Sequence, residues 1–232
     1  MIVSAHQPLF VPWVGFFNKY LAADKFVIVD NVQFPKKEFV NRNRVLGANG
    51  LYLVTIPVNS QNHRGILIRD IEISPNFSPG KIAQSLTDPY KKSKYSGEVD
   101  EIARVITNFD GRFLIDLNLS LIDLFCRLLG IQNQYLIASE LGVEGHKSDY
   151  VLDLCLKTDA TTYIFGSQGR NYVDYKTFQE KQINLKFQNF IRSPNDWYTF
   201  EGNPLGIIHS IANMGGTNLR RAISPGPNDF VE

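Results

Sequence analysis

The chain has 232 residues and a formal net charge of +1 at pH 7, with 44% hydrophobic and 20% charged residues. This length predicts one large domain over residues 1–232, with a helical elaboration at about 75–130, and a core that needs no disulfides. The near-neutral charge excludes a globally basic, polyanion-binding surface. No apolar run approaches the roughly 20 residues of a membrane span, and the N-terminus lacks the pattern of a signal peptide. We therefore expect a cytoplasmic protein.

The first third of the chain predicts strands that flank one helix. Met1–Ala5 is a short apolar strand, and Lys25–Asp30 is apolar enough to be buried on both faces. Between them, Pro12–Ala23 has a proline suited to a first helical turn and apolar residues at helical spacing. Leu51–Val58 predicts a further strand, and the alternation over Leu67–Ile73 predicts a half-exposed one.

The rest of the chain alternates helices and strands. Short helices are expected between Pro75 and Gly111, and a long amphipathic helix is expected over Arg112–Leu129, closed by Gly130. The elements expected after it are a strand at Gln134–Ala138, a helix at Ser148–Lys157 with Ser148 as N-cap, a strand at Thr161–Phe165, a helix at Tyr172–Lys181, a strand at Asn184–Phe190 and a helix at Leu205–Met214.

This alternation predicts an α/β fold with a mainly parallel sheet, flanking helices and some antiparallel edge strands. Such a sheet would be Rossmann-like, and the nucleotidylyltransferase-like form of it stays open. In these sheets ligands bind beyond the carboxyl ends of the strands. The polar or small residues at those ends are His6, Gln7, Asp30, Ser139, Ser167 and Gly169. If the strands are parallel, all of these residues share one edge.

The sequence His6-Gln7-Pro8 follows the first strand. A histidine can exchange a proton or stabilise a developing charge, and a glutamine offers both a donor and an acceptor. We expect His6 to be the acid–base residue, Asp30 to fix its tautomer and Gln7 to orient the substrate. Pro8 and Pro12 would stiffen the turn that aims the ring. A histidine satisfied by local backbone at a strand end is an equally open interpretation.

Residues 31–44, NVQFPKKEFVNRNR, interleave basic and amide side chains directly after a buried strand. We expect a loop that lines the cleft and holds phosphate or carboxylate, chiefly through Arg42 and Lys36. The alternative is a solvated charged loop, and one short basic loop gives little support to nucleic-acid binding. The substrate-binding candidates in this segment are Gln33, Lys36, Asn41, Arg42 and Asn43.

Residues 166–174, GSQGRNYVD, join a predicted strand to a predicted helix. Backbone N–H groups at a helix N-terminus bind anions, so Ser167, Gly169 and Tyr172 are further substrate-binding candidates. The stretch is neither a Walker loop nor GxGxxG, and a plain strand-to-helix turn is equally open.

Other chemistries find little support in the sequence. We expect no metal site, because no two histidines lie at ligand spacing and no cysteine pair supports them. Cys126 and Cys155 lie in apolar helical patterns and are expected to be reduced core residues. No Gly-x-Ser-x-Gly elbow is present.

The first sixty residues resemble the WbqC-like family. Its hallmark is HQP, then PW and G, a strand ending in aspartate, VQF, NRNR and a TVPV-type strand, here LVTIPV. The resemblance continues in LLGI at 128–131, in TTYIFGSQGRNYVD and in KFQNF at 186–190. The chain departs from the pattern in lacking a Tyr-x-Gln before the last helix, and in having His209 where an aspartate is usual. The motif residues matched are His6, Gln7, Pro8, Trp13, Gly15, Asp30, Gln33, Asn41, Arg42, Asn43, Gly169 and Tyr172.

The resemblance implies a bacterial protein of surface-glycan biosynthesis, such as that of O-antigen and lipopolysaccharide. It implies transfer of an acyl or aminoacyl group, for example glycyl, to the amine of a nucleotide-linked amino sugar. The implied partners are that amino sugar and an acyl or aminoacyl donor. A charged tRNA as donor and a homodimer both stay open, and the cofactor is unknown.

Two other functions remain open at this point. One is an ATP-using nucleotidylyltransferase-like or ligase-like enzyme, although the second histidine of the His-x-x-His pair is missing here. The other is a non-catalytic protein that binds a sugar or a nucleotide. Its sign would be an edge at which His6 and Asp30 do not converge.

Overall fold

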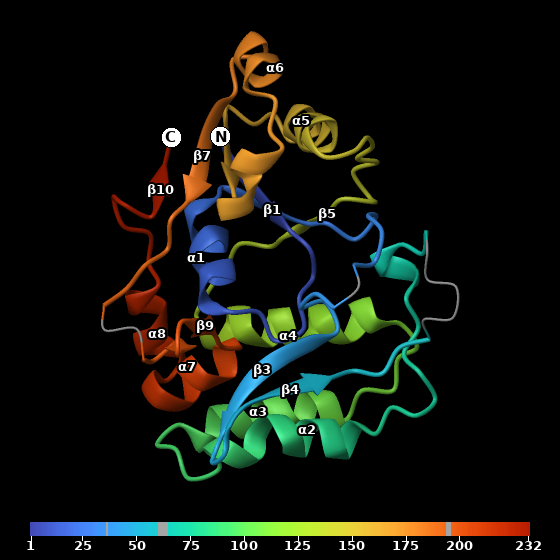
Figure 1. The fold of residues 1–232 in the computed structure, drawn as a ribbon, viewed down its shortest axis with the longest axis vertical. Coiled ribbons are helices and arrows are strands. Elements are labelled where there is room, and N and C mark those ends of the chain that lie inside the picture. Colours follow the sequence, from blue (N-terminus) through green and yellow to red (C-terminus); the bar gives the residue numbers. More distant parts are fainter. Residues whose placement is uncertain (36, 60–64, 194–195) are drawn as a thin grey trace.

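The structure is a computed structural model that describes residues 1–35, 37–59, 65–193 and 196–232. Its central sheet has six strands, which are β1 (Ile2–His6), β2 (Lys25–Ile28), β5 (Leu136–Ile137), β6 (Thr162–Phe165), β7 (Asn184–Gln188) and β10 (Phe230–Val231). Their order is β10-β7-β6-β1-β2-β5. The strands from β7 to β5 are parallel, and β10 pairs with β7 in the antiparallel sense. The mainly parallel α/β sheet with an antiparallel edge strand is therefore confirmed (Figure 1).

The strand order is that of a Rossmann-like fold. From β1 through β2 to β5 the chain adds strands toward one edge of the sheet, and from β6 through β7 to β10 it adds them toward the other edge. The connections therefore diverge between β1 and β6. In open α/β sheets this switch point leaves a crevice outside the carboxyl ends of the strands, where ligands bind.

Helices cover both faces of this sheet. They are α1 (Val14–Ala22) and α4 (Leu114–Leu128) on one face, and α5 (Ser148–Lys157) and α6 (Tyr175–Glu180) on the other. Strand β2 shows the division, because successive residues of a strand point to opposite faces. Phe26 and Ile28 belong to the core that contains α1 and α4, whereas Val27 belongs to the core beneath α5 and α6.

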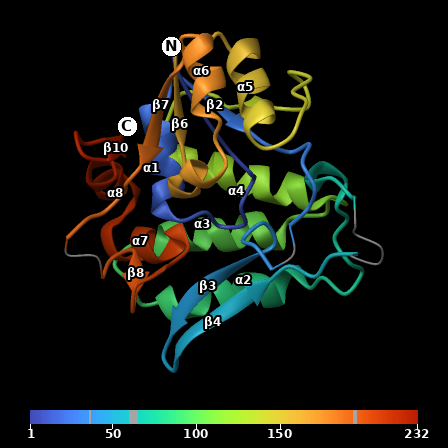
Figure 2. The same ribbon diagram turned by 45° about the horizontal axis from the view of Figure 1, so that its top comes forward.

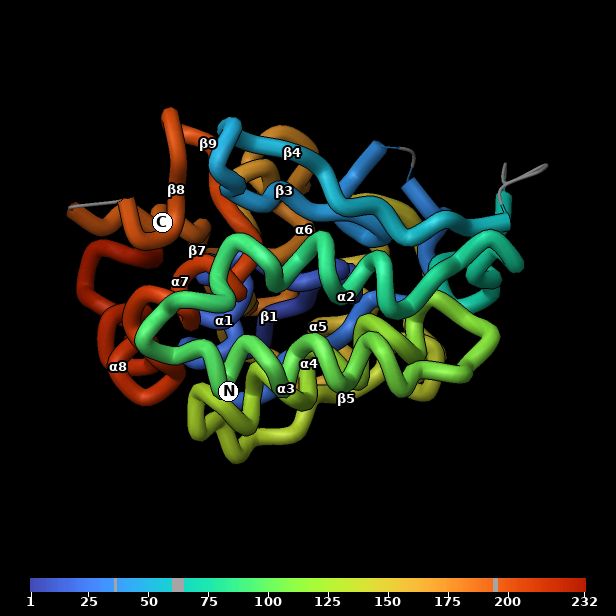
Figure 3. Tube along the Cα trace, turned by 90° about the horizontal axis from the view of Figure 1, so that it is seen from below, coloured from blue at the N-terminus to red at the C-terminus, as the bar shows by residue number. Residues whose placement is uncertain are grey.

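A further layer continues the larger core beyond α4. It consists of α2 (Pro79–Thr87), α3 (Ser96–Thr107) and the antiparallel hairpin of β3 (Arg42–Gly47) with β4 (Gly50–Thr55). Helix α3 packs between α2 and α4, and the hairpin lies along α2 (Figure 3). The hydroxyl of Tyr52 on β4 donates to the carbonyl of Ser85 on α2 at 2.5 Å.

The C-terminal part of the chain packs beside α1 and α3. It contains β8 (Thr199–Phe200), β9 (Asn203–Pro204), α7 (Ile207–Met214) and α8 (Gly216–Ala222). Figure 2 shows α7 and α8 on the same side of the molecule as β10. Helix α8 approaches α4 closely, since a Cβ on Gly216 would lie 2.2 Å from the carbonyl oxygen of Leu128. Among the described residues, no helix is long and apolar enough to cross a membrane.

The strand predicted over Leu67–Ile73 is wrong, because this segment contains the 3-10 turn Ile68–Asp70. Ile68 and Ile71 are both buried in the core. A 3-10 turn brings side chains three residues apart to the same side. The apolar positions thus fit a turn as well as they fit an alternating strand.

The segments on either side of the hairpin turn also differ from expectation. The loop predicted over 31–44 becomes strand at Arg42. The strand predicted over Leu51–Val58 ends at Thr55 and lies outside the central sheet. Leu53 is 53% exposed, because one face of β4 is not covered.

The sequence patterns placed one helix start and one N-cap residue incorrectly. The helix predicted over Tyr172–Lys181 begins at Tyr175, where the carboxylate of Asp174 accepts a hydrogen bond from the backbone N–H of Lys176 and caps the first turn. Helix α5 begins as predicted, but its N-cap position is Lys147. The Ser148 hydroxyl instead accepts a bond from the backbone N–H of Asp174, so it joins α5 to the loop before α6.

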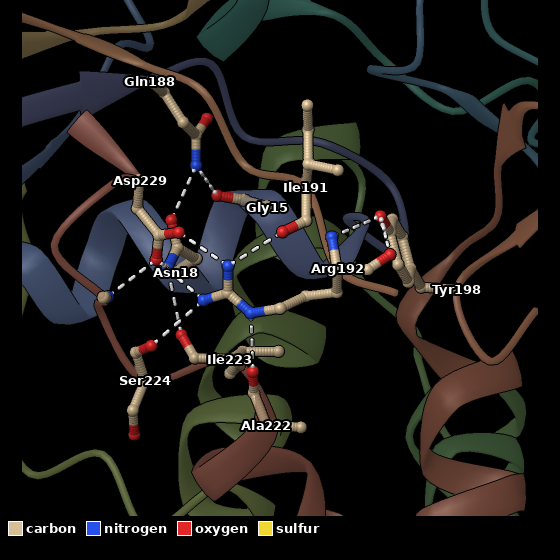
Figure 4. A network of polar contacts seen from close by, with 11 residues as sticks. Gly15, Asn18, Gln188, Ile191, Arg192, Tyr198, Ala222, Ile223, Ser224 and Asp229 are labelled. Carbon is tan, nitrogen blue, oxygen red and sulfur yellow. Dashed lines mark hydrogen bonds and ion pairs between the residues drawn. The ribbon is translucent and has the colours of Figure 1, made fainter. Parts of the chain in front are cut away.

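A polar network ties the C-terminal segment to α1 and β7 (Figure 4). The guanidinium of Arg192 donates to both carboxylate oxygens of Asp229, at 2.6 and 2.7 Å. Asp229 is 3% exposed in its side chain and also accepts from Asn18 at 2.8 Å. Burial would raise the pKa of Asp229, but hydrogen bonds from Arg192, Gly226 and Asn18 outweigh it and hold this pKa below its usual value. The network thereby fixes α1, whose N-terminal end reaches the candidate site.

Candidate functional site

His6 ends β1 at the switch point and is partly buried. Its Nδ1 lies 3.1 Å from the backbone carbonyl oxygen of Gln7. Because a carbonyl only accepts, Nδ1 carries the proton of the neutral ring and Nε2 keeps a lone pair. The ring packs against Phe16 of α1, with centroids 5.2 Å apart. The backbone carbonyl of Gln7 therefore fixes the tautomer of His6, a role that the sequence analysis expected of Asp30.

A buried lysine lies behind His6. Lys19 on α1 is 3% exposed, and its Nζ donates to the carbonyl of Ala5 at 2.8 Å. It has no ion-pair partner in the part of the chain that the structure describes. Burial lowers the pKa of Lys19 to about 7. Burial and the charge of Lys19 lower the pKa of His6 to about 3, against the opposing hydrogen bond to Gln7. His6 is therefore neutral at physiological pH.

Replacing Lys19 with methionine should flatten the pH dependence of stability between about pH 7 and pH 9. In this range an unfolded lysine, with a pKa of 10.5, binds a proton that the folded one, with a pKa of about 7, releases. Since the unfolded state binds more protons, the wild-type free energy of unfolding rises with pH, by at most about 1.4 kcal/mol per pH unit. Urea denaturation at several pH values measures this slope. Lys176→Met, on an exposed lysine of α6, should keep the wild-type slope, and an unchanged slope in Lys19→Met would contradict the assignment.

Two cavities flank His6 and Gln7, one on each side of the sheet edge. The His6 cavity, on the α1 side, has a volume of about 300 Å³. It is lined by His6, Gln7, Leu9, Trp13, Glu38, Phe39, Asn43, Arg44 and Pro204. The guanidinium of Arg44 lies 4.8 Å from the ring centroid of Phe39. This cavity thus combines aromatic walls with one charge of each sign.

Amide side chains hold the wall of the His6 cavity in place. Asn43 donates to the carbonyls of Phe10 and Val11, at 3.0 and 2.5 Å. These bonds brace Val11, whose φ of 49° is unfavourable for a β-branched residue. Asn118 on α4 donates to the carbonyl of Pro8 at 2.9 Å. The segment that follows His6-Gln7-Pro8 is therefore fixed from two sides.

The spacing of Trp13 and Gly15 also has a structural cause. The indole ring of Trp13 lies over the first turn of α1, so that a Cβ on Gly15 would come 2.2 Å from it. Phe190 contacts the same indole edge-on, at 5.9 Å between centroids. A glycine is needed at position 15 to let the ring pack there.

The α5 cavity, on the other side of the sheet edge, has a volume of about 600 Å³. It is lined by Ala5, Gln7, Val29, Val32, Gln33, Gly145, His146, Lys147, Tyr150, Val151, Tyr163 and Tyr172. Gln7 lines both cavities. Because neighbouring residues of an extended chain point to opposite faces of a sheet, His6 and Gln7 together contribute to the lining of both cavities.

Asp30 lies at the same edge of the sheet as His6, as expected. Ile28, the last residue of β2, pairs with His6 in the parallel register. The carboxylate of Asp30 is only 3% exposed and accepts from the backbone N–H and the hydroxyl of Ser139, at 2.9 and 2.5 Å. Asp30 lines neither the His6 cavity nor the α5 cavity. It fixes the turn after β5 and does not point at His6's ring.

Of the other substrate-binding candidates in residues 31–44, some line a cavity and others do not. Gln33 lines the α5 cavity, whereas the amide of Asn41 is buried and donates to the carbonyl of Ile56 at 2.9 Å. The Nε of Arg42 is buried without a partner among the described residues. Lys36 lies outside the described residues. Arg44, which the sequence analysis did not single out, lines the His6 cavity in the place expected of Arg42.

Of the candidates in the segment after β6, one lines a cavity and two do not. Tyr172 lines the α5 cavity and is 42% exposed. Ser167 begins a 3-10 turn and is exposed. Gly169 is buried against Phe165, since a Cβ added to Gly169 would lie only 2.5 Å from the Phe165 side chain. Neither of them lines the two cavities. The guanidinium of Arg170 instead lies 4.1 Å from the ring centroid of Phe187.

Sequence reasoning missed three residues that line the α5 cavity, His146 and Lys147 just before α5 and Tyr150 in its first turn. The signal was present, since they follow the carboxyl end of β5.

In the part of the chain that the structure describes, no three His, Cys, Asp or Glu side chains are grouped so as to hold a metal ion. Cys126 and Cys155 are buried and unpaired.

The fold places the chain among the Rossmann-like α/β proteins, a class in which ligands bind at a switch point of the sheet. The model of the WbqC-like protein family matches residues 7–220, and the chain belongs to this family. It is also 26% identical over 201 residues to the uncharacterized protein Rv1507c of Mycobacterium tuberculosis. The aligned region covers 86% of this chain and 83% of that protein. No solved structure matches the chain.

Proposed function

We propose that the protein transfers an acyl or aminoacyl group, such as glycyl, to the amine of a nucleotide-linked amino sugar in surface-glycan biosynthesis. The observation that carries this proposal is the pair of cavities that meet at Gln7. Two cavities that share one side chain at a switch point can hold a nucleotide-linked amino sugar together with the acyl group that it receives. Family membership is consistent with the proposal and does not by itself define the reaction.

The reaction needs an acceptor for one proton. The amine lone pair attacks the acyl carbonyl carbon, a C–N bond forms, and the bond from that carbon to the leaving group breaks. The amine N–H proton must pass to a base and then to the leaving group. His6 is neutral and has its lone pair on Nε2. We assign to Nε2 the task of accepting the amine proton, which becomes acidic as the C–N bond forms. Because the low pKa of His6 makes the ring a weak base, Nε2 passes the proton directly on to the leaving group.

The His6 cavity suits the sugar amine and the acyl group. Its walls are aromatic at Trp13 and Phe39, and Arg44 and Glu38 add one charge of each sign. The guanidinium of Arg44 is a planar donor suited to a carbonyl or carboxylate oxygen. Asp30 then acts as a positioning residue through its bonds to Ser139.

A non-catalytic protein that binds a sugar nucleotide is the second candidate. The observation that favours it is that the carboxylate of Asp30 is held by Ser139 and is not aimed at His6. A binding protein needs the two cavities but no proton acceptor.

The test is incubation of the protein with nucleotide-linked amino sugars and with acyl thioesters or aminoacyl-tRNA, each with and without ATP. Mass spectrometry should detect the amide, with a mass increase equal to the acyl group less one hydrogen. A product that requires ATP would identify a ligase in place of a simple transferase. Binding of the amino sugar with no amide under any donor would contradict the transferase and support the binding protein.

A further inference from the structure

The α5 cavity differs from the His6 cavity in charge as well as in size. At about 600 Å³ it has about twice the volume of the other. None of its lining residues is acidic, and Lys147 and His146 stand at its rim. The His6 cavity, in contrast, includes the carboxylate of Glu38. A ligand with more than one negative charge is therefore better accommodated in the α5 cavity.

Several polar groups of the α5 cavity are free to contact a ligand. Within the described residues, Lys147 Nζ has no ion-pair or hydrogen-bond partner, and neither has the side-chain amide of Gln7 or of Gln33. The hydroxyl of Tyr150 is different, because it donates to the Asn31 side chain at 2.6 Å. The base of the cavity is thus fixed, while its cation and amides remain available.

Tyr172 offers a flat apolar surface at the cavity. Its ring packs edge-on against Phe165, at 6.0 Å between centroids, and it remains 42% exposed. Aromatic rings held in this way stack with bases, which is a contact that tolerates any base. A stacking ring, a cation and free amides around one cavity match the three parts of a nucleotide.

We propose that the α5 cavity binds the nucleoside diphosphate part of the substrate, with Lys147 at the phosphates and Tyr172 against the base. This inference rests on the proposed function and adds to it a division of the substrate between two cavities. The sugar then extends past Gln7 toward His6.

The more usual location for a phosphate in a Rossmann-like fold is the first helix N-terminus after β1. Here Trp13 covers that turn, as the 2.2 Å approach to Gly15 shows. The α1 side therefore lacks the open backbone amides that a phosphate would need. This is the second reason for placing the phosphates on the α5 side.

Calorimetry with UDP and dTDP tests the inference, with uridine and inorganic pyrophosphate as the probes of each part. Lys147→Gln should weaken binding of UDP and pyrophosphate by about tenfold or more, because it removes a charged hydrogen bond. Tyr172→Ala should weaken UDP and uridine by about tenfold through lost stacking and should leave pyrophosphate unchanged. Matched controls are Lys176→Gln and Tyr175→Ala on α6, since Lys176 is exposed and Tyr175 lines a separate cavity.

The outcomes separate this inference from the proposed function. UDP binding that depends on Lys147 and Tyr172 supports the inference even if no amide is ever formed. Absence of binding by both nucleotides at millimolar concentration would overturn it. Binding that survives both substitutions and is lost in Arg44→Gln would overturn it too, by placing the nucleotide in the His6 cavity.

Discussion

His6→Ala is expected to fold like the wild type and to lower turnover in the amide-forming assay by about 10²–10⁴-fold, the range of general acid–base catalysis. The ring is partly buried, and among the described residues its hydrogen bond is to the neighbouring Gln7 carbonyl. Its removal therefore costs little stability. It does remove the free lone pair on Nε2 in the His6 cavity, beside the Gln7 side chain that lines both cavities.

His6→Asn is the matched control for this prediction. An asparagine can keep the donor to the Gln7 carbonyl but has no atom at the position of Nε2. Its turnover should be as low as that of His6→Ala, and its thermal unfolding should match the wild type. If His6→Asn retains turnover, or if His6→Ala unfolds with unchanged specific activity in the folded fraction, the histidine is structural.

Arg192→Ala is expected to lower the free energy of unfolding by about 3–5 kcal/mol, the cost of breaking a buried ion pair on one side. It would leave the carboxylate of Asp229, 3% exposed, without its cation (Figure 4). Urea denaturation followed by circular dichroism measures the change. Arg112→Ala, which breaks the exposed pair with Glu72 at 2.6 Å, should have a much smaller effect, because solvent screens an exposed pair.

Acid should affect the same network with a definite sign. The folded pKa of Asp229 lies below its ordinary value of 3.8. The stabilisation is therefore complete above that value and is lost as the pH falls below it toward the folded pKa. Asp229→Asn should lose this acid dependence. A loss of under 1 kcal/mol in Arg192→Ala at neutral pH would show that the network contributes little.

The parallel sheet was predictable because its strands are short apolar runs separated by helical periodicity. β1 and α5 match their expected ranges closely, and parallel pairing then placed His6 and Asp30 at one edge. Local sequence patterns are enough to predict these strands and helices, because apolar residues repeat with different periods in the two. The strand predicted over Leu67–Ile73 was wrong, because Ile68 and Ile71, three residues apart, both face the core from a 3-10 turn.

The inside of the site was less predictable, because it depends on where side chains point. Asn41 and Asn43 resemble ligand-reading amides in the sequence but donate to backbone carbonyls. Lys19 lies in a helical pattern and is buried behind β1 only because α1 packs there. Arg44, and not Arg42, lines the His6 cavity once β3 fixes the orientation of both. Long-range packing decides each of these cases.

The position of Gln7 has a thermodynamic consequence. Its side chain lines both cavities, so an occupant of either one restricts the conformations that the amide can offer to the other. The affinities of the two occupants are then coupled. By linkage the coupling must be reciprocal, with each ligand changing the affinity of the other by the same factor. In the protein with one cavity filled, the free energy then differs according to which cavity is occupied. A single amide at the end of one strand would thereby determine which ligand is bound first at equilibrium.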